Sequence, residues 1–513
     1  MGYGWQTLAQ ARQQLRERLY DTASSQFWTD TELNAIISDS LRQWNALTSF
    51  WRGDFTFPPI YSQSFYDLTA QANTLRPLTV TDQSIFTDIE YSLLEPPVGA
   101  GPWTGSSQFS IDDILGAVQR RRDEILSITG CTISSHIVPA LPGRTFLPDT
   151  VTEIRRIAWL TATGTPLFVD DNLVAGNRPG TVFTLAGAPS PSSSLELYWN
   201  GLLQTQGVDY NITGAVITMV NTVNPGDQLE AFYRTTQVTG ARVWKGDTWE
   251  AQAFEPQYTT NVGGTPNIYM ESAQPPLSFD VDVPPGVPSQ YEALTLDSGP
   301  PLTTSGPTTM NIPDDWTWVI RYGALADLLS RDSEAKDLPR AQYCEARYRQ
   351  GLELLRGAPA LLAFRVNNVP VQIDSVTAVD SFFPAWQSVD PGQPSLALTE
   401  GLNLIALSPS PDISPYGLMA TVVTNAPLPA SDGAYIQLGR DEYDAVLDLC
   451  EHSAMFKAGG TEFLSSTPLL ERFLKVAAFY NSKLITEFAF QKFLYMVSQR
   501  DAVENPRTED VNA

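Results

Sequence analysis

The feature that most limits the fold is the division of helical sequence into three blocks, at residues 1–131, 312–358 and 440–513. The segments between these blocks contain many prolines, and proline cannot donate to the hydrogen-bond ladder of an inner strand. Short strands are therefore expected there. Because 513 residues exceed what one hydrophobic core usually holds, the chain is expected to fold as several units.

Two start signals define helices in the first block. Thr29 with Glu32, and Ser110 with Asp113, have the spacing of a capping box, in which each side chain bonds to the backbone of the other residue. Apolar residues at helical spacing follow both boxes. A further amphipathic helix is expected over 5–20, so block 1–131 is interpreted as a helical region.

The segments between the first and second helical blocks are predicted to be rich in strand. Segment 132–180 is interpreted as a β-rich connection. Segment 181–234 has alternating runs separated by turns, including an Asn-Gly turn, and is predicted to be a β-sandwich. Segment 235–311 is rich in Pro, Gly, Thr and Ser and is interpreted as an extended arm, ordered on a neighbour or disordered.

The second half of the chain repeats the alternation. Segment 312–358 predicts a helical hairpin, and segment 359–439 predicts a β-rich insertion of short strands. In block 440–513 one helix is expected over 440–457 and a long one over 467–500. The long helix is apolar around most of its circumference, which predicts burial within the subunit or against neighbouring subunits in a ring.

Together these patterns predict an α+β multidomain protein with a helical bundle core, β-sandwich-like insertions and extended arms. No run approaches the roughly eighteen apolar residues that a membrane-spanning helix needs. The first residues also lack the apolar run of a signal peptide, so synthesis and assembly in the cytoplasm are expected.

The charge balance favours some functions over others. With 32 Lys and Arg against 57 Asp and Glu, the net charge is −25. A nucleic-acid-binding module needs a basic stripe that displaces counterions, and a surface this acidic repels phosphate. The balance suits a conduit through which DNA slides without binding, although on charge alone plain solubility is the favoured explanation.

The residue types that carry catalysis are few. The histidines are His136 and His452, and the sequence has neither a Gly-x-Ser-x-Gly elbow nor a phosphate-binding glycine loop. Cys131, Cys344 and Cys450 are widely spaced, so buried thiols are expected rather than disulfides or a zinc site. No catalytic, metal or cofactor residue is predicted, and the chain is not expected to be an enzyme.

Three groups of side chains nevertheless have a functional alternative. Carboxylate pairs at Asp170-Asp171, Asp280/Asp282 and Asp441-Glu442 leave a glycosidase open, although Asp441-Glu442 also suits a helix start. The basic run Arg120-Arg121-Arg122 is interpreted as a salt-bridged or solvated face, with an ion pair between subunits as the alternative. Tyr198, Trp199 and Tyr210 are assigned to core packing, with an aromatic sugar platform as the alternative.

Parts of the sequence resemble a family of large phage head-to-tail adaptor proteins. Ile312-Pro313-Asp314-Asp315-Trp316 with Ala324 to Leu329 and Arg340 to Cys344 resembles the helical hairpin of that family. Phe456 to Phe463, followed by Pro468 to Phe473, resembles its C-terminal end. The run Phe27 to Leu33 resembles the start shared by many small phage connector adaptors.

This resemblance implies a structural virion protein at the neck of a tailed phage, assembled in the host bacterium. Such a protein docks beneath the portal protein and forms a homo-oligomeric ring matching the portal's symmetry, a dodecamer. It receives a tail or nozzle protein, and DNA passes through its lumen without specific binding. The alternative is a tail-fibre or other receptor- or glycan-binding tail protein, with or without hydrolytic activity.

Overall fold

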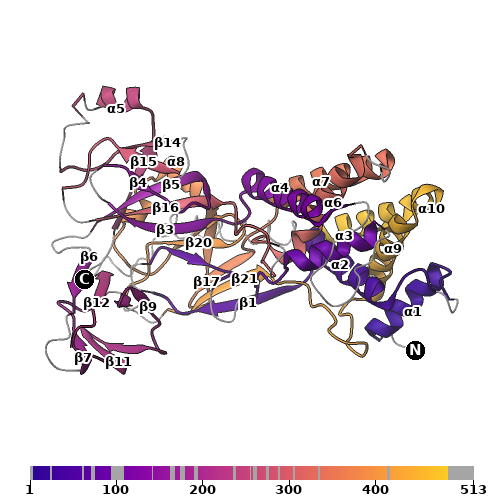
Figure 1. Ribbon diagram of the computed structural model, residues 1–513, viewed down its shortest axis with the longest axis horizontal. Coiled ribbons are helices and arrows are strands. Elements are labelled where there is room, and N and C mark those ends of the chain that lie inside the picture. The colour runs from indigo at the N-terminus through magenta and orange to yellow at the C-terminus, as the bar shows by residue number, and fades with distance from the viewer. Residues whose placement is uncertain are drawn as a thin grey trace, which may run out of the picture.

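The computed structural model describes residues 4–482, apart from 23–25, 61–62, 71–74, 94–108, 141–142, 162–167, 174–179, 190–194, 235–238, 255, 258–262, 273–276, 287–288, 304–306, 333–335 and 413–415. The molecule is elongated, with most helices at one end and the sheets at the other (Figure 1). The chain begins at the helical end. No helix in the described ranges is long and apolar enough to cross a membrane.

The helical end brings together segments that lie far apart in the sequence. It contains α1 (Leu8–Arg18), α2 (Asp30–Thr48), α3 (Asp82–Ser92), α4 (Ile111–Thr129), α6 (Thr317–Ser330), α7 (Leu338–Arg356), α9 (Arg440–Ala458) and α10 (Gly460–Ser465) (Figure 1). A further helix covers 467–482, and the remainder of the predicted 467–500 helix lies outside the described residues. Both predicted capping boxes form, at the starts of α2 and α4.

Two apolar clusters hold these helices together. One joins α3, α4, α6 and α7, with Trp318, Val319 and Phe86 fully buried. The other joins α1, α2, α9 and helix 467–482 around Trp44, which has no exposed surface. Segment 312–358 forms the predicted helical hairpin, because α6 packs along α7.

The first large sheet draws strands from both ends of the sequence. Its seven strands run in the order β1-β21-β17-β18-β19-β20-β2. They are β1 (Arg52–Phe57), β2 (Phe65–Asp67), β17 (Ala363–Val366), β18 (Val369–Ser375), β19 (Leu396–Glu400), β20 (Leu404–Ser408) and β21 (Leu418–Val423). The two edge strands follow each other along the chain, so the short link between them keeps the sheet curved.

The second large sheet also has seven strands, in the order β3-β16-β5-β13-β14-β15-β4. They are β3 (Ser134–Pro139), β4 (Thr145–Phe146), β5 (Val151–Thr161), β13 (Thr239–Lys245), β14 (Ile268–Ser272), β15 (Ser278–Val281) and β16 (Gln290–Asp297). A cluster centred on Trp386 packs this sheet against the first one. Two short helices, α5 (Thr248–Phe254) and α8 (Val376–Phe382), lie at this end of the molecule (Figure 1).

Segment 181–234 lies within a pair of small sheets that share one core. One has the order β10-β11-β7 and the other β6-β12-β8-β9. The strands are β6 (Phe168–Asn172), β7 (Gly180–Thr184), β8 (Glu196–Trp199), β9 (Leu202–Gln204), β10 (Tyr210–Thr213), β11 (Val216–Val223) and β12 (Leu229–Arg234). Buried residues of both sheets, including Leu197, Ile217 and Tyr233, form that core. This sandwich projects from the sheet end (Figure 1).

The predicted helical bundle core is wrong, because the molecule is built mainly of large sheets. The β-rich segments are not insertions into a helical body. Strands from 1–131 and 359–439 complete one sheet, which sequence patterns could not reveal because the pairing joins residues more than 300 positions apart. The extended arm predicted at 235–311 is also wrong. It contributes β13 to β16 to the second sheet, and all eight residues of β16 are buried.

Candidate functional site

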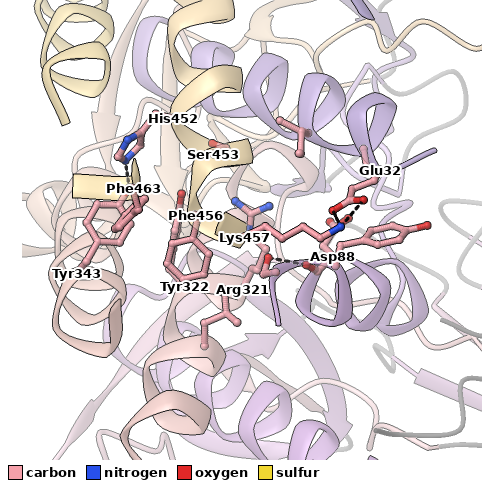
Figure 2. A pocket seen from close by; sticks show the side chains of 15 residues that line it. Glu32, Asp88, Arg321, Tyr322, Tyr343, His452, Ser453, Phe456, Lys457 and Phe463 are labelled. Carbon is pink, nitrogen blue, oxygen red and sulfur yellow. Dashed lines mark hydrogen bonds and ion pairs between the residues drawn. The ribbon is translucent and has the colours of Figure 1, made fainter. Parts of the chain in front are cut away.

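A small cavity lies at the helical end, where α2, α3, α6, α7 and α9 meet (Figure 2). Its charged lining residues are Glu32, Asp88, Arg321 and Lys457. The cavity has a volume of about 30 Å³. A buried water needs on the order of 10–15 Å³ by this measure, so the space holds one or two waters and not a substrate.

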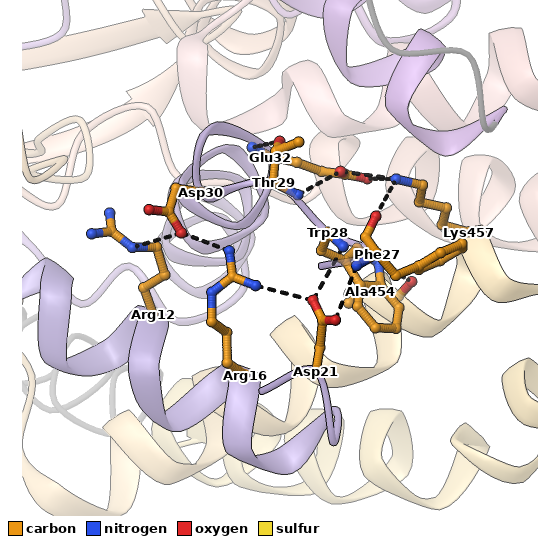
Figure 3. A network of polar contacts seen from close by, with 10 residues as sticks. All are labelled: Arg12, Arg16, Asp21, Phe27, Trp28, Thr29, Asp30, Glu32, Ala454 and Lys457. Carbon is orange, nitrogen blue, oxygen red and sulfur yellow. Dashed lines mark hydrogen bonds and ion pairs between the residues drawn. The ribbon is translucent and has the colours of Figure 1, made fainter. Parts of the chain in front are cut away.

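Lys457 and Glu32 form a buried ion pair across this cavity. The Nζ atom of Lys457 lies 2.8 Å from Oε1 of Glu32 and also donates to the carbonyl of Phe27 at 3.2 Å. Glu32 is the third residue of the capping box and accepts from the Thr29 amide at 3.3 Å. The capping box therefore positions the carboxylate that anchors α9 to α2 (Figures 2 and 3).

A second buried pair lies close by. The Arg321 Nη2 atom of α6 is 2.8 Å from Oδ2 of Asp39 in α2. Burial raises the pKa of nearby Asp88 to about 6, although Arg321 opposes the rise. Arg321 is the single basic residue of α6, a mostly apolar helix, and a charge in such a helix is a sequence signal that could have pointed to this buried site.

His452 is a buried, neutral histidine of this region. Its Nε2 atom is 2.8 Å from the hydroxyl of Tyr343, and its Nδ1 atom is 2.8 Å from Oγ of Ser466. The ring also stacks on Phe463. Burial, helped by the charge of Arg347, lowers its pKa to about 4. Because both ring nitrogens are engaged, His452 cannot serve as a base for the neighbouring Ser453.

A polar network fastens the N-terminal helix to the same region (Figure 3). Arg16 of α1 reaches Asp21 at 3.0 Å and Asp30 at 2.6 Å. Asp21 accepts the backbone amides of Phe27 and Trp28, and the Trp28 indole donates to the Ala454 carbonyl at 3.2 Å. The contacts join the start of α2 to both α1 and α9, which makes this end of the molecule one connected unit.

The second histidine lies in the sheet end. The Nε2 atom of His136 on β3 is 3.1 Å from Oδ2 of Asp297 on β16. Thr295 donates to the other oxygen of Asp297 at 2.7 Å. Burial raises the pKa of this carboxyl, but the hydrogen bonds from His136 and Thr295 outweigh burial and lower it overall. His136 and His452 thus lie at opposite ends, so the structure does not bring them into one site.

The three carboxylate pairs lie in different parts of the fold. Asp282 accepts three backbone amides, whereas Asp280 pairs with Arg144 at 3.2 Å. Asp441 and Glu442 occupy the first turn of α9, as the helix-start interpretation predicts. Asp170 and Asp171 lie in β6 of the sandwich. In the described part of the chain no group of three or more His, Cys, Asp or Glu side chains is placed to hold a metal ion.

The basic run of α4 is paired within the subunit. Arg120 and Arg121 both reach Asp327 of α6, and Arg121 also lies 3.1 Å from Glu345. Arg122 is buried and donates to the carbonyl of Pro300. The salt-bridged interpretation is confirmed within the subunit. The alternative of an ion pair between subunits stays a prediction, and of the three arginines it suits the half-exposed Arg120 best.

The predicted thiol and aromatic environments can also be checked. Cys131, Cys344 and Cys450 are free and buried, as predicted. Tyr210 is 1% exposed and belongs to the sandwich core, whereas Trp199 packs at the edge of that core. Tyr198 instead lies against Phe232 with ring centroids 5.7 Å apart. These three aromatics face different surroundings, so they form no common sugar platform.

Large apolar side chains are exposed at both ends of the molecule. At the helical end they include Trp5, Tyr20, Phe27, Tyr435, Leu464 and Phe479. At the sheet end they include Phe146, Val182, Leu202, Val216, Val220 and Trp249. Such side chains mark contacts with other molecules where several of them lie together on one surface. Which of them are exposed could not be predicted from the sequence, because exposure depends on how distant elements pack.

Compared with models of known protein families and with curated protein sequences, the chain matches none of them.

Proposed function

We propose that this protein is a structural virion component, a head-to-tail adaptor whose copies form a ring between portal and tail. The observation that carries the proposal is that the two ends of the subunit differ in structure. Helices and sheets occupy opposite ends of the molecule (Figure 1). Each end also exposes large apolar side chains. A subunit that joins two different partners needs two separate contact surfaces of this kind.

The candidate site supports a role in which the protein acts by binding partners through its surface. Glu32 and Lys457 pair across the cavity, Arg321 pairs with Asp39, and the cavity itself accommodates only water. Most of the helices that line it belong to segments that resemble the adaptor family. In this proposal the polar cluster fixes the arrangement of the helices that dock on the portal protein.

The acidity of the chain supports the proposed passage of DNA. Residues 246–320 contain ten Asp and Glu and no Lys, Arg or His, and residues 366–439 also lack all three basic types. Both segments contribute strands to the large sheets. A lumen lined by such segments repels phosphate, so DNA slides through it without sticking.

The test is cryo-electron microscopy of the full chain mixed with the portal protein of the same virus. We expect rings of the chain on one face of the portal, with a tail or nozzle protein binding the free face. The control is the chain without portal, which shows what assembles unaided. A chain that leaves the portal bare and binds host-surface glycans instead would replace the adaptor with a receptor-binding tail protein.

A further inference from the structure

The sandwich exposes one sheet face whose central rows carry no charge, although the molecule as a whole is acidic. The outward residues of β7, β10 and β11 include Val182, Thr184, Asn211, Thr213, Val216 and Thr218, and all six are exposed. The carboxylate next to these rows belongs to Asp209, beside Val220, and it accepts the Thr205 amide at 2.8 Å. The opposite outer face, on β8 and β12, carries Glu196 and Glu230.

The strand register turns these residues into an ordered array. Asn211, Thr218 and Val182 lie side by side across the three strands. The next row, one pleat along, consists of Thr213, Val216 and Thr184. The inward residues between them, such as Ile217, are buried in the sandwich core, so the rows cannot turn away from solvent.

We propose that this face, the outer surface of β7, β11 and β10, is the contact between one copy of the chain and the next. The partner is a second copy because of charge. A basic partner would select an acidic face, whereas two copies that each carry a net charge of −25 approach with least repulsion where carboxylates are few. Within about 10 Å, the screening length at 0.1 M salt, facing carboxylates would repel.

The residue types suit a rigid contact. Val and Thr are branched at Cβ and hold one side-chain conformation, so little side-chain entropy is lost when they are covered. A flat sheet face packs on another surface at about 10 Å. The sandwich also projects from the sheet end, where a neighbour can reach it (Figure 1). As a contact between subunits, this inference rests on the proposed ring.

The test places one charge at the centre of the face. Thr218→Glu should weaken self-association at least about 100-fold, because a carboxylate would be buried without a partner. The matched control is Thr56→Glu, an exposed Thr on the outer side of the edge strand β1. Multi-angle light scattering of the full chains, over a range of concentrations, reports multiples of the 56.4 kDa subunit.

Salt dependence and portal binding separate the outcomes. The contact is supported if the wild-type chain self-associates more strongly as salt rises and Thr218→Glu loses this association. This outcome supports the contact whether or not the portal protein binds. If Thr218→Glu assembles as well as Thr56→Glu, the inference fails, and rings on portal would leave the proposed function standing. A wild-type chain that stays monomeric, both alone and on portal, overturns both. Self-association that weakens as salt rises would mean that the copies meet through ion pairs and not through this uncharged face, and would also overturn the inference.

Discussion

Buried charges concentrate where the helical end meets the sheets. Asp314 accepts the amides of Thr79 and Val80 and the side chain of Asn425. Asp315 beside it accepts from Asn45 at 2.6 Å and from the Ala426 amide at 3.2 Å. One short helical turn, η2 (Asp314–Trp316), therefore ties α2 to the segment that follows β21.

The pH dependence of stability offers a prediction at Asp315. Burial raises its pKa to about 7, although the hydrogen bonds from Asn45 and Ala426 oppose the rise. Between the unfolded value of 3.8 and about 7 the folded state holds the extra proton, so this group's contribution to stability falls as pH rises. The full change is on the order of 4 kcal/mol.

Asp315→Asn should remove this dependence. The amide has one acceptor where the carboxyl has two, so at pH 5 the variant should be less stable by about 1–3 kcal/mol. By pH 8 the gap should close or reverse, because only the wild type has lost stability. Urea unfolding at both pH values measures the difference, with Asp332→Asn, whose side chain is fully exposed, as control. Parallel pH curves for Asp315→Asn and wild type would contradict the assignment.

Single elements were predictable where their signals are local. The capping boxes at Thr29 and Ser110 placed α2 and α4 almost to the residue, and the predicted helix over 440–457 is α9. Strand β16 was missed because its polar residues, Gln290 and Glu292 among them, disguise a fully buried strand. Glu292 accepts from Gln387, a partner 95 positions away, and no local pattern can reveal such compensation.

The candidate functional site was also predictable only in part. The start of α2, which supplies Glu32, follows from a sequence motif. Its pairing with Lys457, and that of Asp39 with Arg321, depends on how α2 packs against α9 and α6, so the sequence could not predict the cavity. The exposed face of β7, β11 and β10 likewise depends on a strand order that joins non-consecutive strands.

Helix 467–482 supplies the prediction at the scale of an element. Phe473 is fully buried and lies 6.1 Å from Trp44 between ring centroids, whereas Phe479, on the same helix, is 56% exposed. Phe473→Ala should lower the free energy of unfolding by about 3–5 kcal/mol, because it leaves a cavity in the cluster around Trp44. The control Phe479→Ala should change it by less than about 0.5 kcal/mol. Equal effects in thermal melts would mean that this helix does not pack as described.

At the scale of the whole molecule, shape and charge act together. The helical end is held by paired charges and two apolar clusters, and most strands of the large sheets come from segments that carry few or no basic residues. A connector that grips partners through apolar contacts at its ends can leave the remaining surface acidic. Binding to the partners and passage of DNA then depend on different residues, so the two proposed properties can be tested separately.

The proposed passage of DNA through the ring predicts that the assembled protein does not bind DNA. Mixed at micromolar concentration with a 60-base-pair duplex in 50 mM salt, the protein should leave the duplex mobility unchanged, because no phosphate contact releases counterions from the DNA. A polyarginine peptide serves as positive control. Retention of the duplex, with an affinity that falls as salt rises, would mean that arginines converge on the DNA path and would contradict an acidic conduit. The measurement is independent of portal docking, since a ring that binds its portal protein could still bind DNA and so contradict the prediction.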